Sequence, residues 1–419
     1  MGARKGGLPR SSTTEAATGR PYQLLWRTRR TACRLWIEHA AAGRRRCTLM
    51  PDANCRRHGF REVPLRPVIK PALVRLWRDG SCVQLGLDAQ RAVVLDGVSD
   101  AVSALLDLID GSREWADVLT AATARGCDPD DAAALLDTLL ASGLLDDASA
   151  VPDGLPVDEL DRLAADFAHE SLLATSPGAA AEALVRRRAS RIVVVGAGRV
   201  GSALARLLAA AGSGVVTVCD PRPGRAADAG PAGFPVPRDG RTRAFATAAA
   251  GSRAKGLRLQ ATRLACDDPR LYAGAALAVL APDVYTGPAP ALAATLIATH
   301  TPYLLAAVRE TRGIVGPLVL PGVTSCPRCH DLTRADRDPA WPLLAAQLSV
   351  VRPGAVPACD IALATLVASV AAGQVHDHLA GRPVSVLGAT LEIPLPHWRL
   401  HRRPWRIHPA CGCTASAAS

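Results

Sequence analysis

The sequence has no stretch long enough to cross a membrane and no export signal at its start. No run approaches the roughly 20 apolar residues that a membrane helix requires, and the apolar stretch 361–373 is too short. The first twenty residues lack the apolar segment of a secretory signal peptide. These absences predict a cytoplasmic protein. In a reducing cytoplasm, cysteine pairs are more typical of metal sites than of disulfides.

Lysine and methionine are also scarce. Only three of the 49 basic residues are lysine, and this arginine bias, with abundant alanine, is typical of a GC-rich bacterial coding sequence. The two methionines are Met1 and Met50. We therefore expect translation to start at or after Met50, and we interpret residues 1–63 as a basic extension that is disordered or wrongly assigned as coding.

The net charge of +11 does not by itself indicate nucleic-acid binding, because it is unevenly distributed. Residues 1–50 hold eleven basic and two acidic residues, a net of +9, which leaves +2 for the rest of the chain. A basic tail on a near-neutral body accounts for the excess, so we expect neither a nucleic acid nor a membrane as partner. The length of 419 residues allows two or three domains.

A strand, a glycine turn and a helix are predicted in the middle of the chain. Residues 191–195 form a β-branched run typical of a strand buried on both faces. Gly196, Gly198 and Gly201 follow at a spacing that permits a tight turn, close approach to a phosphate and close helix packing. The helix N-terminus offers free N–H groups to an anion. Asp220 lies 19 residues after Gly201, where a carboxylate can accept hydrogen bonds from ribose hydroxyls.

Alternating strands and helices continue to residue 307 and predict an α/β fold. The expected architecture is a Rossmann-like, doubly wound, mainly parallel sheet, followed by an antiparallel extension at 314–320 and by two further strands at 384–387 and 391–395. The carboxyl ends of parallel strands share one edge of the sheet, where ligands bind. Asp220 and Asp283 are therefore expected on the same rim.

Residues 64–150 predict a separate small domain of winged-helix type. Apolar and polar residues alternate on both sides of Arg78-Asp-Gly-Ser81, which indicates a hairpin. Three short helices are expected next, the last one capped by Asp128 with Pro129 at its first position. The many acids between residues 101 and 147 disfavour binding of this domain to DNA phosphates. Residues 151–190 are expected to form a helical linker to a second domain at 191–419.

Two tight cysteine pairs near the end of the chain supply four thiolates. The pattern is Cys-x-x-Cys, 81 intervening residues, then Cys-x-Cys, formed by Cys326, Cys329, Cys411 and Cys413. Two such pairs can close a tetrahedral zinc site, which is structural because it leaves no position for water. Unrelated thiols or a disulfide are the alternative. The first pair is expected in a loop.

The glycine turn, the acid that follows it and the distal cysteines together resemble the ThiF/MoeB family, relatives of the ubiquitin-activating enzymes. The resemblance covers about residues 185–415, including the stretch 381–393, which is similar to the strand pair before the family's last cysteines. It implies activation of a C-terminal carboxylate as an acyl-adenylate. ATP with Mg²⁺ would be the cofactor, a peptide or small carrier protein the substrate, and a homodimer the expected assembly.

The resemblance also implies roles for individual residues. Asp283 would handle magnesium, and Arg241 or Arg243 would stabilise charge at the α-phosphate, since the family's lysine falls near Arg241. The remaining expected residues are the nucleotide-lining Gly196, Gly198 and Gly201, the ribose-binding Asp220, and the structural zinc ligands Cys326, Cys329, Cys411 and Cys413.

Three departures from the family pattern bear on catalysis. Arg199 stands where the family usually has a third glycine, and residues 221–230 lack the family's second acid and its Ser-Asn-Leu and Arg-Gln motifs. Arginine replaces the phosphate-neutralising lysine, and the two are not equivalent. In one interpretation the chain is an adenylating enzyme, and in another its nucleotide fold is a scaffold.

The small domain adds a second resemblance. The stretch 106–115 and the later Ser142-Gly-Leu-Leu145 are similar to PqqD-like modules, which bind the leader of a precursor peptide as an added strand on the hairpin edge. With this module the chain resembles the ThiF-type component of thiazole/oxazole-modified peptide pathways. Such a protein delivers the precursor peptide to a separate, ATP-using YcaO-type cyclodehydratase.

Two other functions compete with this interpretation. The glycine turn with Asp220 also suits a nicotinamide cofactor and thus an NAD-dependent oxidoreductase, although no hydride-transfer site follows in the sequence. A DNA-binding regulator built on the winged-helix domain is the third alternative, which the acidic surface disfavours.

Overall fold

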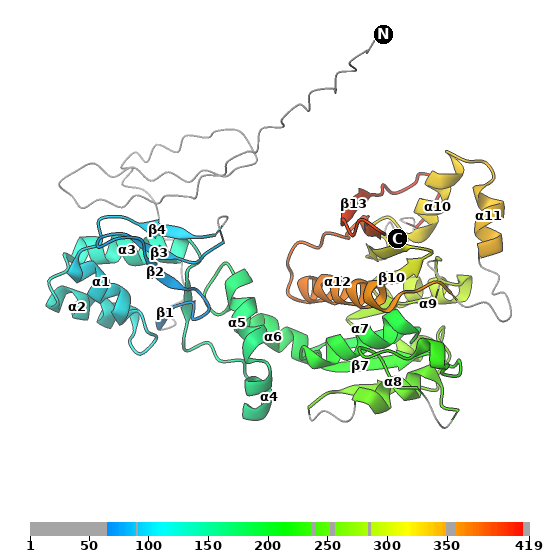
Figure 1. Ribbon diagram of the computed structural model, residues 1–419, viewed down its shortest axis with the longest axis horizontal. Coiled ribbons are helices and arrows are strands. Elements are labelled where there is room, and N and C mark those ends of the chain that lie inside the picture. Colours follow the sequence, from blue (N-terminus) through cyan, green and yellow to red (C-terminus); the bar gives the residue numbers. More distant parts are fainter. Residues whose placement is uncertain are drawn as a thin grey trace, which may run out of the picture. The chain divides into compact units, whose positions relative to one another are not determined.

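The computed structural model describes residues 65–88, 91–236, 240–251, 256–283, 286–348 and 357–413. The predicted extension 1–63 and its start site lie outside the described residues. The chain divides into two compact units. One contains the described residues up to 151 together with 171–179, and the other contains 152–170 and everything from 180 onward. Figure 1 labels the elements of both.

The first unit combines two small sheets with three helices. Its strands are β1 (Pro67–Ile69), β2 (Arg75–Trp77), β3 (Val83–Leu85), β4 (Val93–Leu95) and β5 (Leu145–Asp147), and its helices are α1 (Asp100–Leu108), α2 (Trp115–Ala124) and α3 (Pro129–Ala141). Strands β2, β3 and β4 form an antiparallel meander, and β1 pairs with β5. The core joins Leu85 of β3 to Leu105 of α1 and Leu136 of α3.

The predicted hairpin and three helices are present in this unit. Asp128 caps α3 as expected, because its carboxylate accepts the N–H groups of Asp130 and Asp131. The pairing of β1 with β5 was not predicted, since each strand has only three residues and no alternating pattern of its own.

The segment 171–179, predicted as part of a linker, packs onto the first unit. The buried ammonium of Lys70 donates to the carbonyl of Ala174 at 2.7 Å. The carboxylate of Asp146 accepts the Ser171 hydroxyl at 2.6 Å and the Gly178 N–H at 2.8 Å. Burial lowers the pKa of Lys70, and the nearby Asp146 opposes this shift.

The second unit is built on an eight-stranded sheet with the order β13-β12-β11-β10-β9-β6-β7-β8. Its strands are β6 (Arg191–Val195), β7 (Val215–Cys219), β8 (Leu259–Ala261), β9 (Leu277–Leu280), β10 (Tyr303–Arg309), β11 (Arg312–Val319), β12 (Ala389–Pro394) and β13 (His401–Pro404). Strands β6 to β10 pair in parallel, and β11 to β13 extend the sheet with antiparallel pairs. The predicted α/β class, mainly parallel sheet and antiparallel extension are confirmed.

The remaining helices of the described chain are α4 (Val157–Arg162), α5 (Ala164–Leu173), α6 (Ala179–Ala189), α7 (Arg199–Ala210), α8 (Arg243–Gly251), α9 (Pro290–Ala298), α10 (Pro327–Ala335), α11 (Trp341–Leu348) and α12 (Ile361–Leu379), with short 3-10 turns η1 (Ala226–Asp228) and η2 (Pro269–Leu271). Helices pack on both faces of the large sheet, with α7 and α12 on one face and α9 on the other. Val194 of β6 packs with α7 and α12 on one face, whereas its neighbour Val193 packs with Leu296 of α9 on the other. Figure 1 shows α7 and α12 side by side. No helix among the described residues has the length and apolar character to cross a membrane.

The strand order places a topological switch between β6 and β9. The chain runs from β6 outward to β7 and β8, and then returns to β9 on the opposite side of β6. The residues after β6, β7 and β9 therefore meet at one edge, which is where open α/β sheets bind ligands. Gly196, Asp220 and Asp283 follow these three strands.

Two local predictions were wrong. The first cysteine pair does not lie in a loop, because Cys326 is the N-cap of α10 and Cys329 lies in its first turn. Pro327 stands at the first helical position, where its missing N–H costs no hydrogen bond. Residues 384–387 do not form a strand but make one isolated bridge, between Leu387 and Leu318.

The glycine turn brings three backbone segments into close contact. Gly196 has φ +94°, and a Cβ there would lie 2.3 Å from the carbonyl oxygen of Ala281. A Cβ on Gly201 would lie 2.0 Å from the carbonyl oxygen of Gly196. Both positions therefore require glycine, and α7 lies close to the end of β6 for this reason.

We expect Gly201→Ala to destabilise the protein by about 2–3 kcal/mol, because the new methyl group would collide with a backbone carbonyl that cannot turn aside. Gly373→Ala in α12 is the matched control, since nothing lies within 4 Å of its Cβ position. That change should stabilise the helix by about 0.5–1 kcal/mol. Urea unfolding measures the free energy of unfolding of both variants. If the two changes alter it equally, the close packing assigned to Gly201 is contradicted.

Candidate functional site

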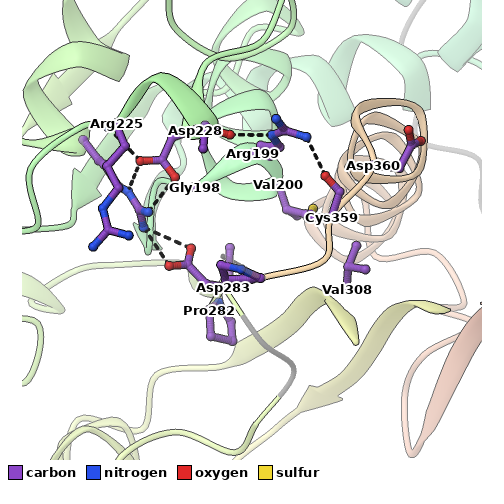
Figure 2. A pocket seen from close by; sticks show the side chains of 14 residues that line it. Gly198, Arg199, Val200, Arg225, Asp228, Pro282, Asp283, Val308, Cys359 and Asp360 are labelled. Carbon is purple, nitrogen blue, oxygen red and sulfur yellow. Dashed lines mark hydrogen bonds and ion pairs between the residues drawn. The ribbon is translucent and has the colours of Figure 1, made fainter. Parts of the chain in front are cut away.

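A cavity of about 300 Å³ lies at the carboxyl edge of the sheet. Its lining comes from the start of α7, the loop after β7, the start of α8, the end of β9 and the segment before α12. Figure 2 shows Gly198, Asp228, Asp283 and Cys359 around it. The cavity therefore occupies the position that the strand order predicts for a ligand.

Asp283 lies directly against the N-terminus of α7. Gly198 is the N-cap of this helix, and a Cβ there would lie 2.5 Å from Oδ1 of Asp283. The absence of a side chain at Gly198 thus makes room for the carboxylate. The structure brings Gly198, Asp283 and Arg243 together at the cavity, with Gly196 and Gly201 forming the turn beneath it.

Asp220 is buried below the cavity, and its side chain is 1% exposed. Its carboxylate accepts the N–H of Ala197 at 2.8 Å and two hydrogen bonds from Arg222, at 2.9 and 2.8 Å. Burial alone would raise the pKa of Asp220, but Arg222 and the Ala197 N–H outweigh it and hold the pKa below its usual range. The carboxylate is therefore ionised and already paired.

Arg243 links the two sides of the cavity. Its buried guanidinium contacts both oxygens of Asp283, at 3.0 and 2.9 Å, and both oxygens of Asp228, at 2.6 and 2.7 Å. Arg222 adds a contact to Asp283 at 2.7 Å. Burial lowers the pKa of Arg243, but the two aspartates outweigh it and raise that pKa above its usual value. Asp220, Arg222, Asp283, Arg243 and Asp228 form one continuous charge network.

Arg241 and Arg199 lie in different surroundings. Arg241 has an exposed side chain and is not among the residues that line the cavity. Arg199, at the first position of α7, donates to the carbonyls of Ala227 and Cys359, at 2.7 and 2.6 Å. It thereby joins the loop after β7 to the segment before α12.

Sequence reasoning missed the roles of Arg222, Asp228 and Arg199. Arg222 follows Asp220 by two residues, and that spacing is the only signal in the sequence that could have suggested the pair. The contacts of Asp228 and Arg199 join residues far apart in the chain, so no local pattern reveals them.

The cavity fits the phosphates of a nucleotide better than its ribose. The N-terminus of α7 suits a phosphate, whereas Arg243 could donate to one only by leaving Asp228 or Asp283. Asp220, the expected ribose acceptor, already has both of its oxygens paired. Charges of the lining side chains also balance, because Arg199, Arg225 and Arg243 face Asp228, Asp283 and Asp360. A triphosphate would therefore need these ion pairs to rearrange.

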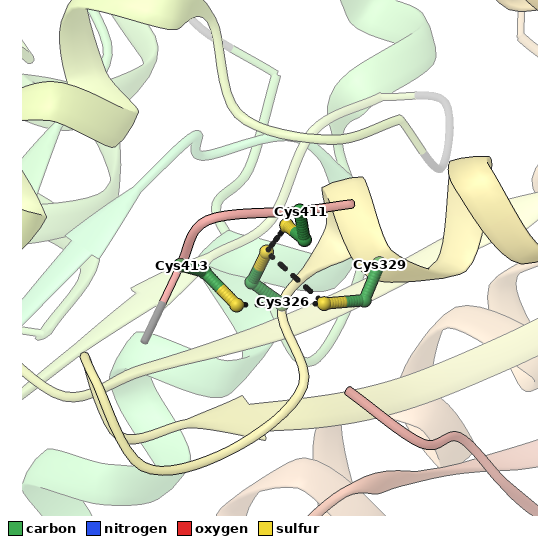
Figure 3. A group of neighbouring side chains, drawn as sticks. All are labelled: Cys326, Cys329, Cys411 and Cys413. Carbon is green, nitrogen blue, oxygen red and sulfur yellow. Dashed lines mark hydrogen bonds between the residues drawn. The ribbon is translucent and has the colours of Figure 1, made fainter. Parts of the chain in front are cut away.

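The four distal cysteines form one cluster between α10 and the chain's final described residues (Figure 3). Their sulfurs all lie within 4.8 Å of one another, with 3.9 Å between Cys326 and Cys329, 3.5 Å between Cys326 and Cys411, and 3.4 Å between Cys329 and Cys413. A tetrahedral zinc–thiolate site with bonds of about 2.3 Å has sulfurs about 3.8 Å apart. The cluster can hold a metal ion, and its all-sulfur donor set fits Zn²⁺.

Comparison with known proteins agrees with the sequence resemblance. The model of the ThiF family matches residues 172–222, which include β6, the glycine turn, α7 and β7. The match is to this segment of the chain. No curated protein sequence matches the chain.

Solved structures share the fold over much more of the chain than the ThiF segment covers. E. coli MccB with succinimide has a TM-score of 0.61 at 16% identity, and MccB with AMPCPP and MccA has 0.63 at 15%, each covering 83% of this chain and 99% of that one. PaaA has a TM-score of 0.53 at 16% identity and covers 65% of this chain and 91% of its own. The ThiF resemblance inferred from the residues is thus confirmed, while the PqqD-like assignment of the first unit stays a prediction.

We expect Arg243→Ala to destabilise the second unit by about 3–5 kcal/mol, because it leaves Asp228 and Asp283 without their shared partner. Arg270→Ala is the matched control: Arg270 pairs with Asp268 at 2.6 Å but is 76% exposed, so its loss should leave the free energy of unfolding almost unchanged. Urea unfolding at neutral pH measures both. If Arg243→Ala lowers the free energy of unfolding no more than Arg270→Ala does, the charge network contributes little to stability.

We expect freshly purified protein to contain about one equivalent of zinc and to lose thermal stability when a strong chelator removes it. Cys413→Ser should lose most of the metal, whereas Cys359→Ser, outside the cluster, should retain it. Elemental analysis of the three proteins checks this. Less than about half an equivalent in the unaltered protein would count against the site.

Proposed function

We propose that the chain binds a precursor peptide through its first unit and delivers it to a separate ATP-using enzyme of the YcaO cyclodehydratase type. In this proposal the ThiF-type unit serves as a scaffold and docking platform. The observation that carries the proposal is the double pairing of Asp283 with Arg222 and Arg243, because it occupies the acid that would otherwise handle magnesium.

The outer edge of β2 supports peptide binding by the first unit. The carbonyl of Val74 accepts the N–H of Gly86, and the N–H of Arg78 donates to Cys82, so residues 74 and 78 bond inward to β3. Because hydrogen bonding alternates along an antiparallel strand, Arg75 and Trp77 direct their N–H and C=O groups outward. Such an edge can pair with an extended peptide.

Exposed apolar side chains accompany this edge. Val74 is 47% exposed, Leu76 37% and Trp77 50%. Because side chains alternate along a strand, Val74 and Leu76 lie on one face of the sheet and Trp77 on the other. Exposed apolar side chains beside an outward strand edge are typical of an interaction site. The combination of backbone groups that point outward with apolar side chains suits a peptide that contributes both a strand and apolar anchors.

Adenylation of a peptide carboxylate is the second candidate function. It is favoured by the contact of Asp283 with the start of α7 and by the likeness of the fold to MccB, whose solved structures include complexes with ATP and with the peptide MccA. Binding of Mg²⁺–ATP would then have to draw Arg243 from Asp283 to the phosphates. The chemistry supplied by bound Mg²⁺ would be neutralisation of phosphate charge.

The proposal includes a cytoplasmic location, a structural zinc ion and a homodimer. The cysteine geometry supports the zinc ion. The family resemblance is the basis for the homodimer. An NAD-dependent reaction is the less favoured reading, because Asp220 is buried and paired and so cannot accept the ribose hydroxyls of that cofactor without moving.

Parallel calorimetric titrations with ATP–Mg²⁺, NAD and a synthetic leader peptide, taken from a precursor encoded beside the gene, test the proposal. We expect micromolar peptide binding and no ATP or NAD binding. Binding of ATP together with peptide-dependent pyrophosphate exchange would establish adenylation instead. Binding of NAD alone would overturn both candidates.

Two variants at one position then test the edge of β2. Trp77→Pro removes both the side chain and the outward N–H, whereas Trp77→Ala removes only the side chain. If the peptide adds a strand here, the proline variant should bind at least about tenfold more weakly than the alanine variant. Circular dichroism controls for folding, and Leu343→Asp on α11 should leave peptide affinity unchanged.

A further inference from the structure

The thiols of Cys219 and Cys266 contact each other next to the glycine turn. Cys219 is the last residue of β7, and Cys266 lies in the loop between β8 and η2. Their sulfur atoms are 2.7 Å apart, although the residues are 47 positions apart in the chain. Among the described cysteines outside the four-cysteine cluster, these are the two whose sulfurs meet.

The backbone around the pair is fixed by several hydrogen bonds. The N–H of Thr262 donates to the carbonyl of Val218 at 3.1 Å, and the Cys219 thiol contacts the carbonyl of Leu264 at 3.4 Å. The hydroxyl of Tyr272 donates to the carbonyl of Cys266 at 2.5 Å. The two thiols are thus held together by the fold and need no large movement to react.

The pair is coupled to the cavity through the backbone of β7. The carbonyl of Cys219 accepts the N–H of Gly196, the first glycine of the turn, at 2.9 Å. The next residue, Asp220, accepts the N–H of Ala197 and pairs with Arg222. A covalent modification of Cys219 would therefore lie next to Asp220, which belongs to the charge network.

The two sulfurs differ in their access to solvent. Cys219 is 1% exposed, whereas Cys266 is partly exposed. The hydrogen bond from Cys219 lowers the pKa of Cys266 against the effect of burial, and the corresponding pKa of Cys219 is raised. A soluble oxidant would therefore meet the Cys266 thiolate first, with Cys219 as the second thiol beside it.

We propose that Cys219 and Cys266 are a redox modification site, at which a peroxide-class oxidant forms a reversible disulfide behind the glycine turn. The Cys266 thiolate attacks one peroxide oxygen, which breaks the O–O bond and gives a sulfenic acid and hydroxide. The Cys219 thiol then attacks the sulfenic sulfur, and the S–O bond breaks with loss of water. In total, two thiols and one hydrogen peroxide give one disulfide and two waters.

The disulfide would restrain the segment that carries Asp220. It would join the end of β7 covalently to the loop after β8, in addition to the hydrogen bonds already present. The closed loop contains the whole stretch between β7 and α8, α8 itself and β8. Oxidation is therefore expected to slow opening of the glycine turn and to stabilise this unit against unfolding.

The test uses the full-length, zinc-loaded protein and a small excess of hydrogen peroxide. Trypsin should then release peptides 207–225 and 264–270 joined by a disulfide, which mass spectrometry detects and dithiothreitol separates. Zinc release is monitored alongside, because peroxide can also attack the four-cysteine cluster. We expect the Cys219–Cys266 link to form before zinc is lost, and the melting temperature to rise by roughly 5–10 °C.

Cys266→Ser and Cys219→Ser should abolish both the linked peptide and the rise in melting temperature, while Cys359→Ser should preserve them. Hydrogen exchange at the amides of Gly196 and Ala197 should slow on oxidation of the unaltered protein and stay unchanged in Cys266→Ser. If Cys219→Ser does not fold, Cys266→Ser decides the question. Oxidation that releases zinc without forming the 207–225 to 264–270 link would overturn the proposal.

Discussion

Close backbone contact between β6, α7 and the end of β9 is the constraint on which the rest of the second unit depends. Gly196 and Gly201 allow three segments to approach within distances that no side chain permits. The same approach brings Gly198 against the carboxylate of Asp283. The position of the cavity is therefore set by the absence of a side chain at Gly196, Gly198 and Gly201.

Because of the charge network, this cavity differs from a simple anion-binding site. Arg243 and Arg222 hold the acids that an adenylating enzyme would direct at magnesium and ribose. Ion pairs of this kind are lost only when a ligand offers comparable contacts, since an unpaired buried charge is costly. The ion pairs therefore keep the cavity stable without a ligand, which agrees with a scaffold role. A nucleotide could bind only if its contacts replaced these ion pairs.

Much of the fold could be predicted because its elements carry local signals. Three sequence patterns each predict the local structure around them: the β-branched run before Gly196, the glycine spacing and the Asp128–Pro129 cap. The three-residue strands β1 and β5 escaped prediction because only their mutual pairing defines them. The helix at Cys326 was missed because the cysteine spacing suggested a loop, while Pro327 in fact begins α10.

The candidate site was predictable to a smaller extent. Asp220, Asp283 and the glycines could be placed at one edge, because strand order alone determines which residues share it. Their contacts could not be derived, since Arg222, Asp228 and Arg243 meet only through the three-dimensional course of the segment between β7 and α8, which no local pattern predicts. The four cysteines were found from spacing alone, because each short pair already holds two sulfurs near each other.

One of the two outermost strands of the large sheet, β13, affects how the protein behaves in concentrated solution. β13 is four residues long and reads His-Arg-Arg-Pro, with three of its residues exposed. Short length, positive charge and a terminal proline all discourage pairing with a strand of another molecule. β2 of the small sheet has none of these except its length and one arginine, and it exposes Leu76 and Trp77 instead. The protein thus protects one strand edge from self-association while leaving another open to a partner.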